Sequence, residues 1–333
     1  MNRQRIEYIW LDGREPLPKM RGKTRFVEKG DLVPDWNFDG GSTNQGSLKD
    51  SDRLLRCVRV YTDPFVEEGL IALCEVLYHD GTPHESNSRN ALSQQEQGFK
   101  EQDPWVGFEQ EFTLFNPSNN QPLGFIVNPT EQGPYYCGVG CLDQVGRYLL
   151  NEFEVACIKA GVMLEGINAE VMQGQWEFQT SHSDPLRGSD DLWVARYLLE
   201  RVAELKPIIV SYDPKPHEDF NGAGCHTNVS TKKSRKSFGE ADMRELMGHM
   251  EADHDKHIKV CGAGIARRMT GTCETSDYEK FTWGIGDRGA SIRIPQSVVT
   301  KGLGYFEDRR PCANIDPYKV VGSLMDSLNK SKV

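Results

Sequence analysis

Acidic and apolar residues alternate along residues 106–114, where the segment has the composition of a β-strand. The strand period of two places Glu109 and Glu111 on one face and Phe108 and Phe112 on the other. Two neighbouring carboxylates repel each other unless a cation lies between them, and carboxylate oxygens are the preferred ligands of hard divalent cations. The pattern therefore predicts a metal site on the polar face of this strand.

A second pair of glutamates flanks a turn in residues 166–180. Glu170 and Glu177 are equidistant from Gln173-Gly174, which is typical of a two-residue hairpin turn. In that register the two side chains are directly opposite, with their β-carbons about 5 Å apart, and a divalent metal would bridge them. A single glutamate on a strand usually serves only solubility. Two independent pairs favour the metal site.

A glycine-rich turn precedes a short strand at residues 220–231, in which alternation aligns His226, Asn228 and Ser230. Glycine permits close backbone approach to a ligand, and a neutral imidazole can join carboxylates around a cation. The Gly-x-Gly pairs at 222–224 and 138–140 match neither the P-loop nor the Rossmann spacing, so a nucleotide, if bound, is held in another way.

The C-terminal third supplies positive charges. In residues 287–295, alternation separates Ile292 and Ile294 from Arg293, and farther along Glu307 and Arg309 are two residues apart. A planar guanidinium group matches the oxygens of a phosphoryl group in transfer. The alternative is a set of structural ion pairs. Because exposed pairs contribute little to stability, this clustering in apolar strands favours a function.

The elements that must position these residues indicate an α+β protein. A chain of 333 residues with 38% apolar content can form a small and a large domain, or two medium ones. Strand-like alternation dominates residues 1–80, and helical periodicity occurs at 142–161, 190–206 and 239–260. We interpret the polar stretch at 79–103 as a connection between two domains. We predict a small domain at 1–80, a large domain at 81–333, strands joined by hairpins, and helices packed outside them.

Composition excludes several functional classes. Apolar runs fall short of the roughly 20 residues that cross a bilayer, and the first residues do not form a secretory signal. The nine cysteines have no C-x-x-C spacing and are predicted to be reduced thiols of a cytoplasmic protein. A net charge of −10 disfavours nucleic acid, and we interpret the basic run at 232–236 as a solvated loop.

Six segments together resemble the signature sequences of eukaryotic-type (type II) glutamine synthetase, and they occur in the family's order. They are WNFDGGST at 36–43, GFEQE at 107–111, GPYYCGVG at 133–140, NGAGCHTN at 221–228, ASIRIP at 290–295 and YFEDRRP at 305–311. The resemblance extends from about residue 8 to 316. It implies a β-grasp N-terminal domain and a catalytic domain with an antiparallel sheet flanked by helices.

The same resemblance implies an activity: ATP-dependent joining of ammonia to L-glutamate through γ-glutamyl phosphate, giving glutamine, ADP and phosphate. ATP is then a co-substrate, and Mg²⁺ or Mn²⁺ is the cofactor. The implied metal ligands are Glu111, Glu170 and Glu177 for one ion, and Glu109, His226 and Glu307 for the second. The implied catalytic residues are Asp39, Glu274, Arg288 and Arg309. The implied substrate-binding residues are Arg268, Asn221, Gly222 and His226, and the ATP-binding residues are Trp105, Arg288, Arg293 and Tyr305.

Family likeness further implies a homo-oligomer, a decamer of two pentameric rings with active sites shared between subunits. The net charge and the short apolar runs predict no nucleic-acid or membrane partner. The chain departs from the family at Cys273 (usually histidine), Asp287 (usually asparagine) and Gln173 (usually proline), and it begins at the first strand without an N-terminal helical arm. Three alternatives stay open: a relative that lost turnover, a ligase for another amine, and a protein that uses its metal only for stability.

Overall fold

The structure is a computed structural model that describes residues 3–125 and 133–333. Its strands are β1 Arg3–Leu11, β2 Met20–Glu28, β3 Trp36–Asp39, β4 Asp52–Thr62, β5 Leu70–Leu77, β6 Trp105–Asn116, β7 Gln121–Pro122, β8 Leu164–Ala169, β9 Gln175–Thr180, β10 Ile209–Ser211, β11 Cys225–Ser230, β12 Trp283–Ile285, β13 Ile292–Ile294 and β14 Phe306–Asp308. Its α-helices are α1 Ser88–Phe99, α2 Arg147–Ala160, α3 Pro185–Glu204, α4 Glu240–Ala252, α5 His254–Ile258, α6 Ile265–Arg268, α7 Gln296–Lys301 and α8 Pro317–Leu328. Two 3-10 turns are η1 Gly40–Thr43 and η2 Lys100–Gln102.

The first five strands form one sheet in the order β2-β1-β5-β4-β3, in which β1 and β5 are parallel and the other neighbours antiparallel. One face carries Ile6, Tyr8 and Trp10, which pack in a small core of their own. The opposite face contributes Ile9 and Tyr61 to the main core of the protein. The small N-terminal β-domain is therefore attached to the rest through shared apolar packing. The exact boundary at residue 80 stays a prediction.

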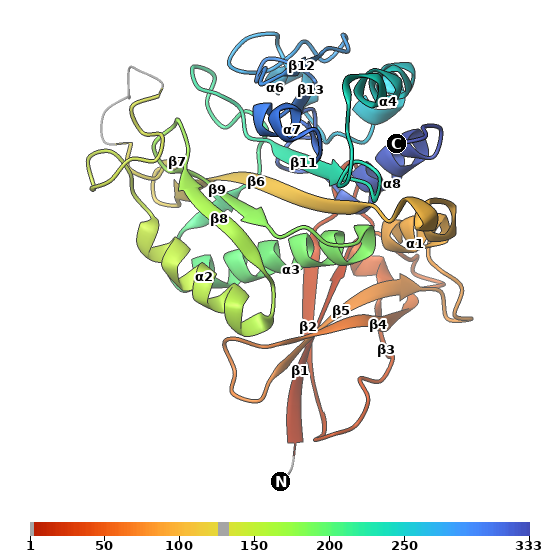
Figure 1. Cartoon of the computed structure of the whole chain (residues 1–333). Helices are drawn as coiled ribbons and strands as arrows, with labels where there is room; N and C mark the ends of the chain where they lie inside the picture. Colours follow the sequence, from red (N-terminus) through yellow and green to blue (C-terminus); the bar gives the residue numbers. More distant parts are fainter. Residues whose placement is uncertain (1–2, 126–132) are drawn as a thin grey trace.

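The second sheet has the order β12-β13-β14-β11-β6-β9-β8, with β7 and β10 also paired to β6. Its pairings are antiparallel except for β12 with β13, so the sheet is mixed. Helices α2 and α3 lie along one face of it, between this sheet and the N-terminal one (Figure 1). The α+β class with helices outside the sheet is confirmed.

Several helix predictions need correction. The helix predicted at 190–206 begins at Pro185, and the one predicted at 239–260 is divided into α4 and α5. Residues 79–103, interpreted as a connection, contain α1, which begins where Asn87 accepts a hydrogen bond from the Asn90 N–H. The capping residue was visible, but the helix has few apolar residues and hence no clear periodicity. The helix predicted from residue 142 begins only at Arg147, after Gly146 with a φ of +95°. In the described parts of the chain, no helix is both long and apolar enough to cross a membrane.

A buried acidic pair on α3 connects this helix to the N-terminal sheet and to two other helices. Asp190, whose side chain is fully buried, accepts hydrogen bonds from Arg59 on β4 at 2.9 Å, from Arg89 on α1 at 2.8 Å and from Tyr318 on α8 at 2.7 Å. Asp191 accepts a bond of 2.7 Å from Tyr61. Two guanidinium groups and a hydroxyl offset the desolvation of the Asp190 carboxylate, so this contact depends on all its partners.

Asp190→Asn should lower the free energy of unfolding by about 3–5 kcal/mol, because the amide leaves two partly buried guanidinium groups without a counter-charge. Urea denaturation of the whole chain measures this. The matched control is Glu240→Gln, which removes a carboxylate from an exposed helical pair with Arg244 and should cost at most about 0.5 kcal/mol. If the two substitutions lower the free energy of unfolding equally, Asp190 does not hold α3 against β4, α1 and α8 as described.

Candidate active site

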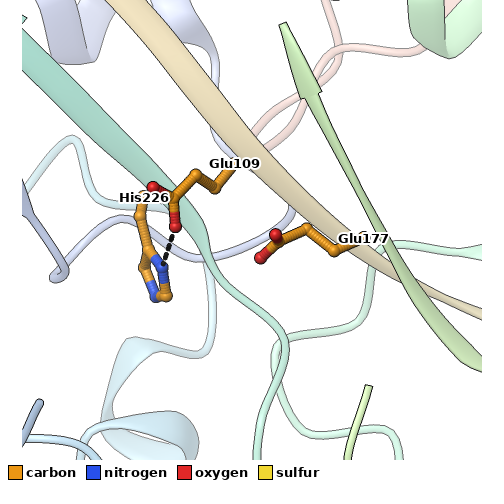
Figure 2. Close-up of side chains that lie close together, drawn as sticks. All are labelled: Glu109, Glu177 and His226. Atoms are coloured by element: carbon orange, nitrogen blue, oxygen red, sulfur yellow. Dashed lines mark hydrogen bonds and ion pairs between the residues drawn. The ribbon is translucent and has the colours of Figure 1, made fainter. Parts of the chain in front are cut away.

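Polar side chains form a grid on one face of the large sheet because neighbouring strands are in a fixed register. His226 on β11 pairs with Glu109 on β6, and Glu111 on β6 pairs with Glu177 on β9. Figure 2 shows Glu109, Glu177 and His226 directed toward one space from three neighbouring strands. Phe112, on the other face of β6, is completely buried. The predicted separation of acidic and aromatic faces on this strand is confirmed.

The predicted register of the Glu170–Glu177 hairpin is wrong. Glu177 pairs with Asn168, and the Glu170 N–H donates to the Gln175 carbonyl, so the loop contains residues 171–174 rather than Gln173-Gly174 alone. The shift amounts to two residues along β8, and a shift of two preserves the face on which a side chain lies. Glu170 therefore still reaches the cluster, although from the loop end and not directly opposite Glu177.

Among the described residues, two groups of side chains offer ligand atoms, and within each group these atoms lie within 4.8 Å of one another. One contains Glu111, Glu170 and Glu177, which is the set predicted for the first metal. The other contains Glu109 and His226, as predicted, together with Glu177. Glu177 thus belongs to both groups and lies between them. Oxygen-rich sets with one imidazole fit Mg²⁺ or Mn²⁺.

Burial and crowding perturb these carboxyl groups. Desolvation raises the pKa of Glu111 to about 7, against the opposing charge of Arg268. Desolvation and the nearby charge of Glu111 raise the pKa of Glu170 to about 8 and raise that of Glu177 well above its usual value. Each ionised form is thus disfavoured by its surroundings. A bound cation would remove this penalty, which supports the fit of the residues to a metal.

His226 is held as a neutral imidazole. Its pKa is lowered far below the usual range, first by burial and then by the charge of Arg309. The Nδ1 atom lies 3.4 Å from Glu109 Oε2, while Nε2 accepts a hydrogen bond of 3.0 Å from Arg268. A neutral imidazole beside a carboxylate is suited to ligate a cation, because protonation would block the ring nitrogen.

Glu307 occupies a different position from the other glutamates. It lies 3.5 Å from His226 Nδ1, but its two oxygens accept hydrogen bonds of 2.6 Å from Arg293 and from Arg309. It is 1% exposed and is not among the described residues that line the cavity. In this arrangement Glu307 orients two guanidinium groups, and its predicted role as a metal ligand stays a prediction.

Two glycines allow the chain to pass close behind the cluster. A β-carbon at Gly224 would lie 2.5 Å from Arg268 Nη2 and 2.8 Å from His226 Nε2. One at Gly222 would lie 2.5 Å from the Pro214 carbonyl oxygen. The Gly224 N–H also donates to Glu111 Oε2 at 2.7 Å. The glycine-rich turn is therefore required by backbone packing against Arg268 and His226.

The cluster lines a cavity of about 180 Å³. Guanidinium groups surround its acidic floor; they belong to Arg268, Arg288, Arg293 and Arg309. Asn221 and Gly222 line it as well, and the segment 273–275 lies at its exposed side.

Two positions at which the chain departs from the family pattern, Cys273 and Asp287, lie among or next to the residues that line this cavity. Cys273 and Glu274 both have positive φ angles, of 53° and 58°. Asp287, the acidic neighbour of Arg288, accepts the Gly289 N–H at 2.8 Å.

A second cavity, of about 300 Å³, adjoins the first, and both are lined by Glu109 and Gln179. Trp105 and Tyr305, predicted for ATP, lie in this second cavity. The Arg235 guanidinium lies 3.9 Å from a Trp105 ring centroid, and the His182 ring stacks on Trp105 at 4.9 Å. Sequence reasoning missed both residues: Arg235 belongs to the run interpreted as a solvated loop, and only the fold brings it to Trp105.

Asp39 is the predicted catalytic residue that the fold separates from the others. It ends β3, which is the outer edge strand of the N-terminal sheet and lies away from β6, β9 and β11 (Figure 1). Its carboxylate is exposed and accepts hydrogen bonds from Ser42 Oγ at 2.7 Å and the Gly41 N–H at 3.0 Å. These bonds, that of Ser42 most, lower the pKa of Asp39 and keep it ionised.

Comparison with known proteins identifies similar chains over nearly the full length. Residues 82–328 match the family described as glutamine synthetase, catalytic domain. A glutamine synthetase of Streptomyces viridochromogenes is 46% identical over 97% of this chain and 96% of its own length. One of Eremothecium gossypii is 45% identical over 97% of this chain and 88% of its own, and the Arabidopsis thaliana cytosolic isozyme 1-3 is 40% identical over 96% and 93%.

The raised pKa values predict a stability that depends on pH and on metal. The folded pKa values of Glu111 and Glu170, about 7 and about 8, exceed the ordinary value of 4.5, so the metal-free folded state binds more protons than the unfolded state. Its free energy of unfolding should therefore fall as pH rises from about 4.5 to about 8. With a chelator, the urea midpoint should be lower at about pH 8.5 than at about pH 6, and saturating Mn²⁺ should restore it.

Glu177→Gln serves as the control, because it removes one of the repelling charges while it keeps the side-chain size. The chelated variant should be more stable than the parent at about pH 8.5 and should gain less from Mn²⁺. Midpoints that Mn²⁺ leaves unchanged in the parent would show that these carboxylates do not hold a cation.

Proposed function

The chain belongs to the glutamine synthetase family, and from this premise we propose how its residues carry out the family's reaction. The reaction joins ammonia to L-glutamate at the expense of ATP through γ-glutamyl phosphate, and it releases glutamine, ADP and phosphate. One observation carries the proposal: buried carboxylates and an imidazole line the same cavity as four arginines. Such a site can hold cations on one side and phosphate oxygens on the other.

The metal assignment follows from the two groups of ligand atoms. Glu111, Glu170 and Glu177 would hold one Mg²⁺ or Mn²⁺, and Glu109 and His226, with Glu307 behind them, would hold the second. When bound, these cations neutralise phosphate charge and help to orient the transferring group. Glu177, which belongs to both groups, would contact both cations.

The nucleotide is proposed to lie across the two adjoining cavities. Trp105 and Tyr305 in the second cavity would contact the base, and Glu109 lies at the junction that leads to the cluster. The γ-phosphoryl group would then reach Arg288, Arg293 and Arg309. Arg293 supports this placement, because its Nε atom is buried without a hydrogen-bond partner among the described residues. Glu307 holds the guanidinium groups of Arg293 and Arg309 in place before substrate arrives.

Glutamate is proposed to bind beside the nucleotide phosphates. Arg268 would pair with its α-carboxylate, and Asn221, Gly222 and His226 would surround its side chain. The Arg268 guanidinium is preoriented because it donates to the carbonyl oxygens of Arg309 and Arg310 at 3.0 and 3.2 Å. Binding of the α-carboxylate would hold the substrate so that its γ-carboxylate lies beside the γ-phosphoryl group of ATP, which brings the reacting atoms together.

Two further acidic residues are proposed for the second half of the reaction. Glu274, on the exposed segment at the cavity mouth, would cover the acyl phosphate and exclude water. Asp39 would accept a proton from ammonium, a role that suits a carboxylate held ionised by Ser42 and Gly41. Its place on an edge strand away from the cavity suggests that it serves the cavity of a neighbouring subunit.

Shared sites require a closed assembly, and a ring is the closed arrangement that head-to-tail contacts produce. We therefore propose a homo-oligomer in which each N-terminal sheet covers its neighbour's cavity, with two stacked pentameric rings as the expected form. One Arabidopsis thaliana relative is named a cytosolic isozyme, which supports a cytoplasmic location.

The function is tested by coupled product measurement. With ATP, Mg²⁺ and glutamate, phosphate release should depend on ammonium, and glutamine and phosphate should form in equal amounts. Glu274→Ala should still release phosphate but form severalfold less glutamine for each phosphate, because the acyl phosphate is no longer protected from water. A variant that retains full coupling would contradict the covering role of Glu274. Phosphate release by the parent without glutamate would contradict the reaction itself.

The shared site is tested by complementation. Asp39→Ala and Glu177→Ala chains, each inactive alone, are dissociated, mixed in equal amounts and reassembled. Random assembly gives about a quarter of the interfaces an intact Asp39 beside an intact Glu177, so about that fraction of parental activity should return. Parent chains dissociated and reassembled alone serve as the control. If assemblies that demonstrably contain both chains stay inactive, each subunit builds its own site.

A further inference from the structure

Two cysteines face each other across central strands of the N-terminal sheet, far from the cavity. Cys57 on β4 is the register partner of Cys74 on β5, immediately before a bulge that offsets Arg59 by one residue. Directly opposed residues of an antiparallel pair have Cα atoms about 4.5–5.5 Å apart, which lies inside the range of disulfides, about 4.4–6.8 Å. The β-carbons of opposed residues are typically about 4.5–5.5 Å apart, and a disulfide requires about 3.5–4.5 Å, so the two strands would need to move about 1 Å closer. The neighbouring bulge is a local irregularity of the strand pairing at which such a movement can occur.

The two thiols differ in the way that a thiol oxidation site requires. Cys57 is partly exposed, whereas Cys74 is 6% exposed and packs with the small core. A hydrogen bond from Cys74 lowers the pKa of the Cys57 thiol, while burial raises that of Cys74. Cys57, which packs at the edge of the same core, is thus the more accessible thiol of the pair and the one whose pKa is lowered, and Cys74 lies beside it as a resolving thiol.

Other cysteines of the chain lack this combination. Cys261 and Cys312 also lie close, since the Cys312 N–H donates to the Cys261 carbonyl at 2.9 Å, but both are at most 1% exposed. Cys137, Cys141 and Cys273 are exposed but lie outside the strands of the described chain, so no strand register there places them opposite another cysteine. Cys57 therefore combines partial exposure to solvent with a cysteine directly opposite on the neighbouring strand.

From this juxtaposition we propose that Cys57 and Cys74 form a reversible dithiol–disulfide site that reacts with peroxides. The Cys57 thiolate attacks one peroxide oxygen, so that an S–O bond forms, the O–O bond breaks and hydroxide leaves as water after taking a proton. The Cys74 thiol then loses its proton and attacks the Cys57 sulfur, which releases a second water. In total, two thiols and hydrogen peroxide give one disulfide and two waters, with two electrons passing from sulfur to oxygen.

The test uses the full chain with Cys137, Cys141 and Cys273 replaced by serine, which leaves Cys57 as the most exposed thiol. After treatment of the folded protein with hydrogen peroxide, the intact mass should fall by two hydrogens. A non-reducing peptide map should join the Cys57 and Cys74 peptides, and dithiothreitol should reverse both results. Adding Cys74→Ser should stop the reaction at a Cys57 sulfenic acid, which dimedone traps, and adding Cys57→Ser should abolish it.

Two results would overturn the site. One is a Cys57 that stops at the sulfenic acid while Cys74 is still present, which would show that the strands do not let the sulfurs meet. The other is a cross-link between Cys261 and Cys312 that forms as fast as the one proposed, because then local opening and not the exposed pair would determine the reaction.

Discussion

The arrangement of the whole site depends on one electrostatic constraint, the burial of several carboxylates on a single face of a sheet. Glu111 and Glu177 are direct cross-strand partners, and both are nearly buried. Like charges in that position are unfavourable unless a cation compensates them. These paired carboxylates therefore lower the stability of the metal-free fold. They also make the cavity suited to bind cations, together with the phosphate groups that such cations would hold.

The arginines that line the cavity place positive charge beside the buried carboxylates. Arg293 and Arg309 are each tied to Glu307, and Arg268 is tied to backbone carbonyls and to His226. Their guanidinium groups therefore need little reorganisation when negative charge develops in the cavity, which is how fixed dipoles and charges lower a barrier. Helices α2 and α3 and the N-terminal sheet lie on the side of the large sheet that faces away from this chemistry, where the Asp190 contacts connect α3 to β4, α1 and α8.

Much of this could be predicted from the sequence because strand alternation is a local property. The faces of Glu109, Glu111, His226 and Arg293 follow from a period of two, whatever strands lie beside them. Register is not local: Glu170 was expected opposite Glu177, and a longer loop places Asn168 there. Helix α1 was not predicted because its sequence is mostly polar and lacks the periodic apolar residues that indicate a helix, although Asn87 could be recognised as a capping residue.

Other features depend on contacts between distant segments or between chains. Arg235 and Trp105 are 130 positions apart in the sequence (235 − 105), and only the folded chain brings them together, so the sequence alone indicated a solvent-exposed basic run. The separation of Asp39 from the cavity is likewise a consequence of the arrangement of the two sheets, and the cavity that we propose for it, that of a neighbouring subunit, lies outside a single chain.

The most direct measurement of the central claim counts metal ions. Electron paramagnetic resonance during Mn²⁺ titration of the assembled protein should find two ions bound for each chain, and Glu177→Gln should weaken both sites, because Glu177 belongs to both groups of ligand atoms. Titration of Glu240→Gln should match the parent. A parent that binds no Mn²⁺ at this cluster, or a Glu177→Gln variant with two sites of unchanged affinity, would contradict the account.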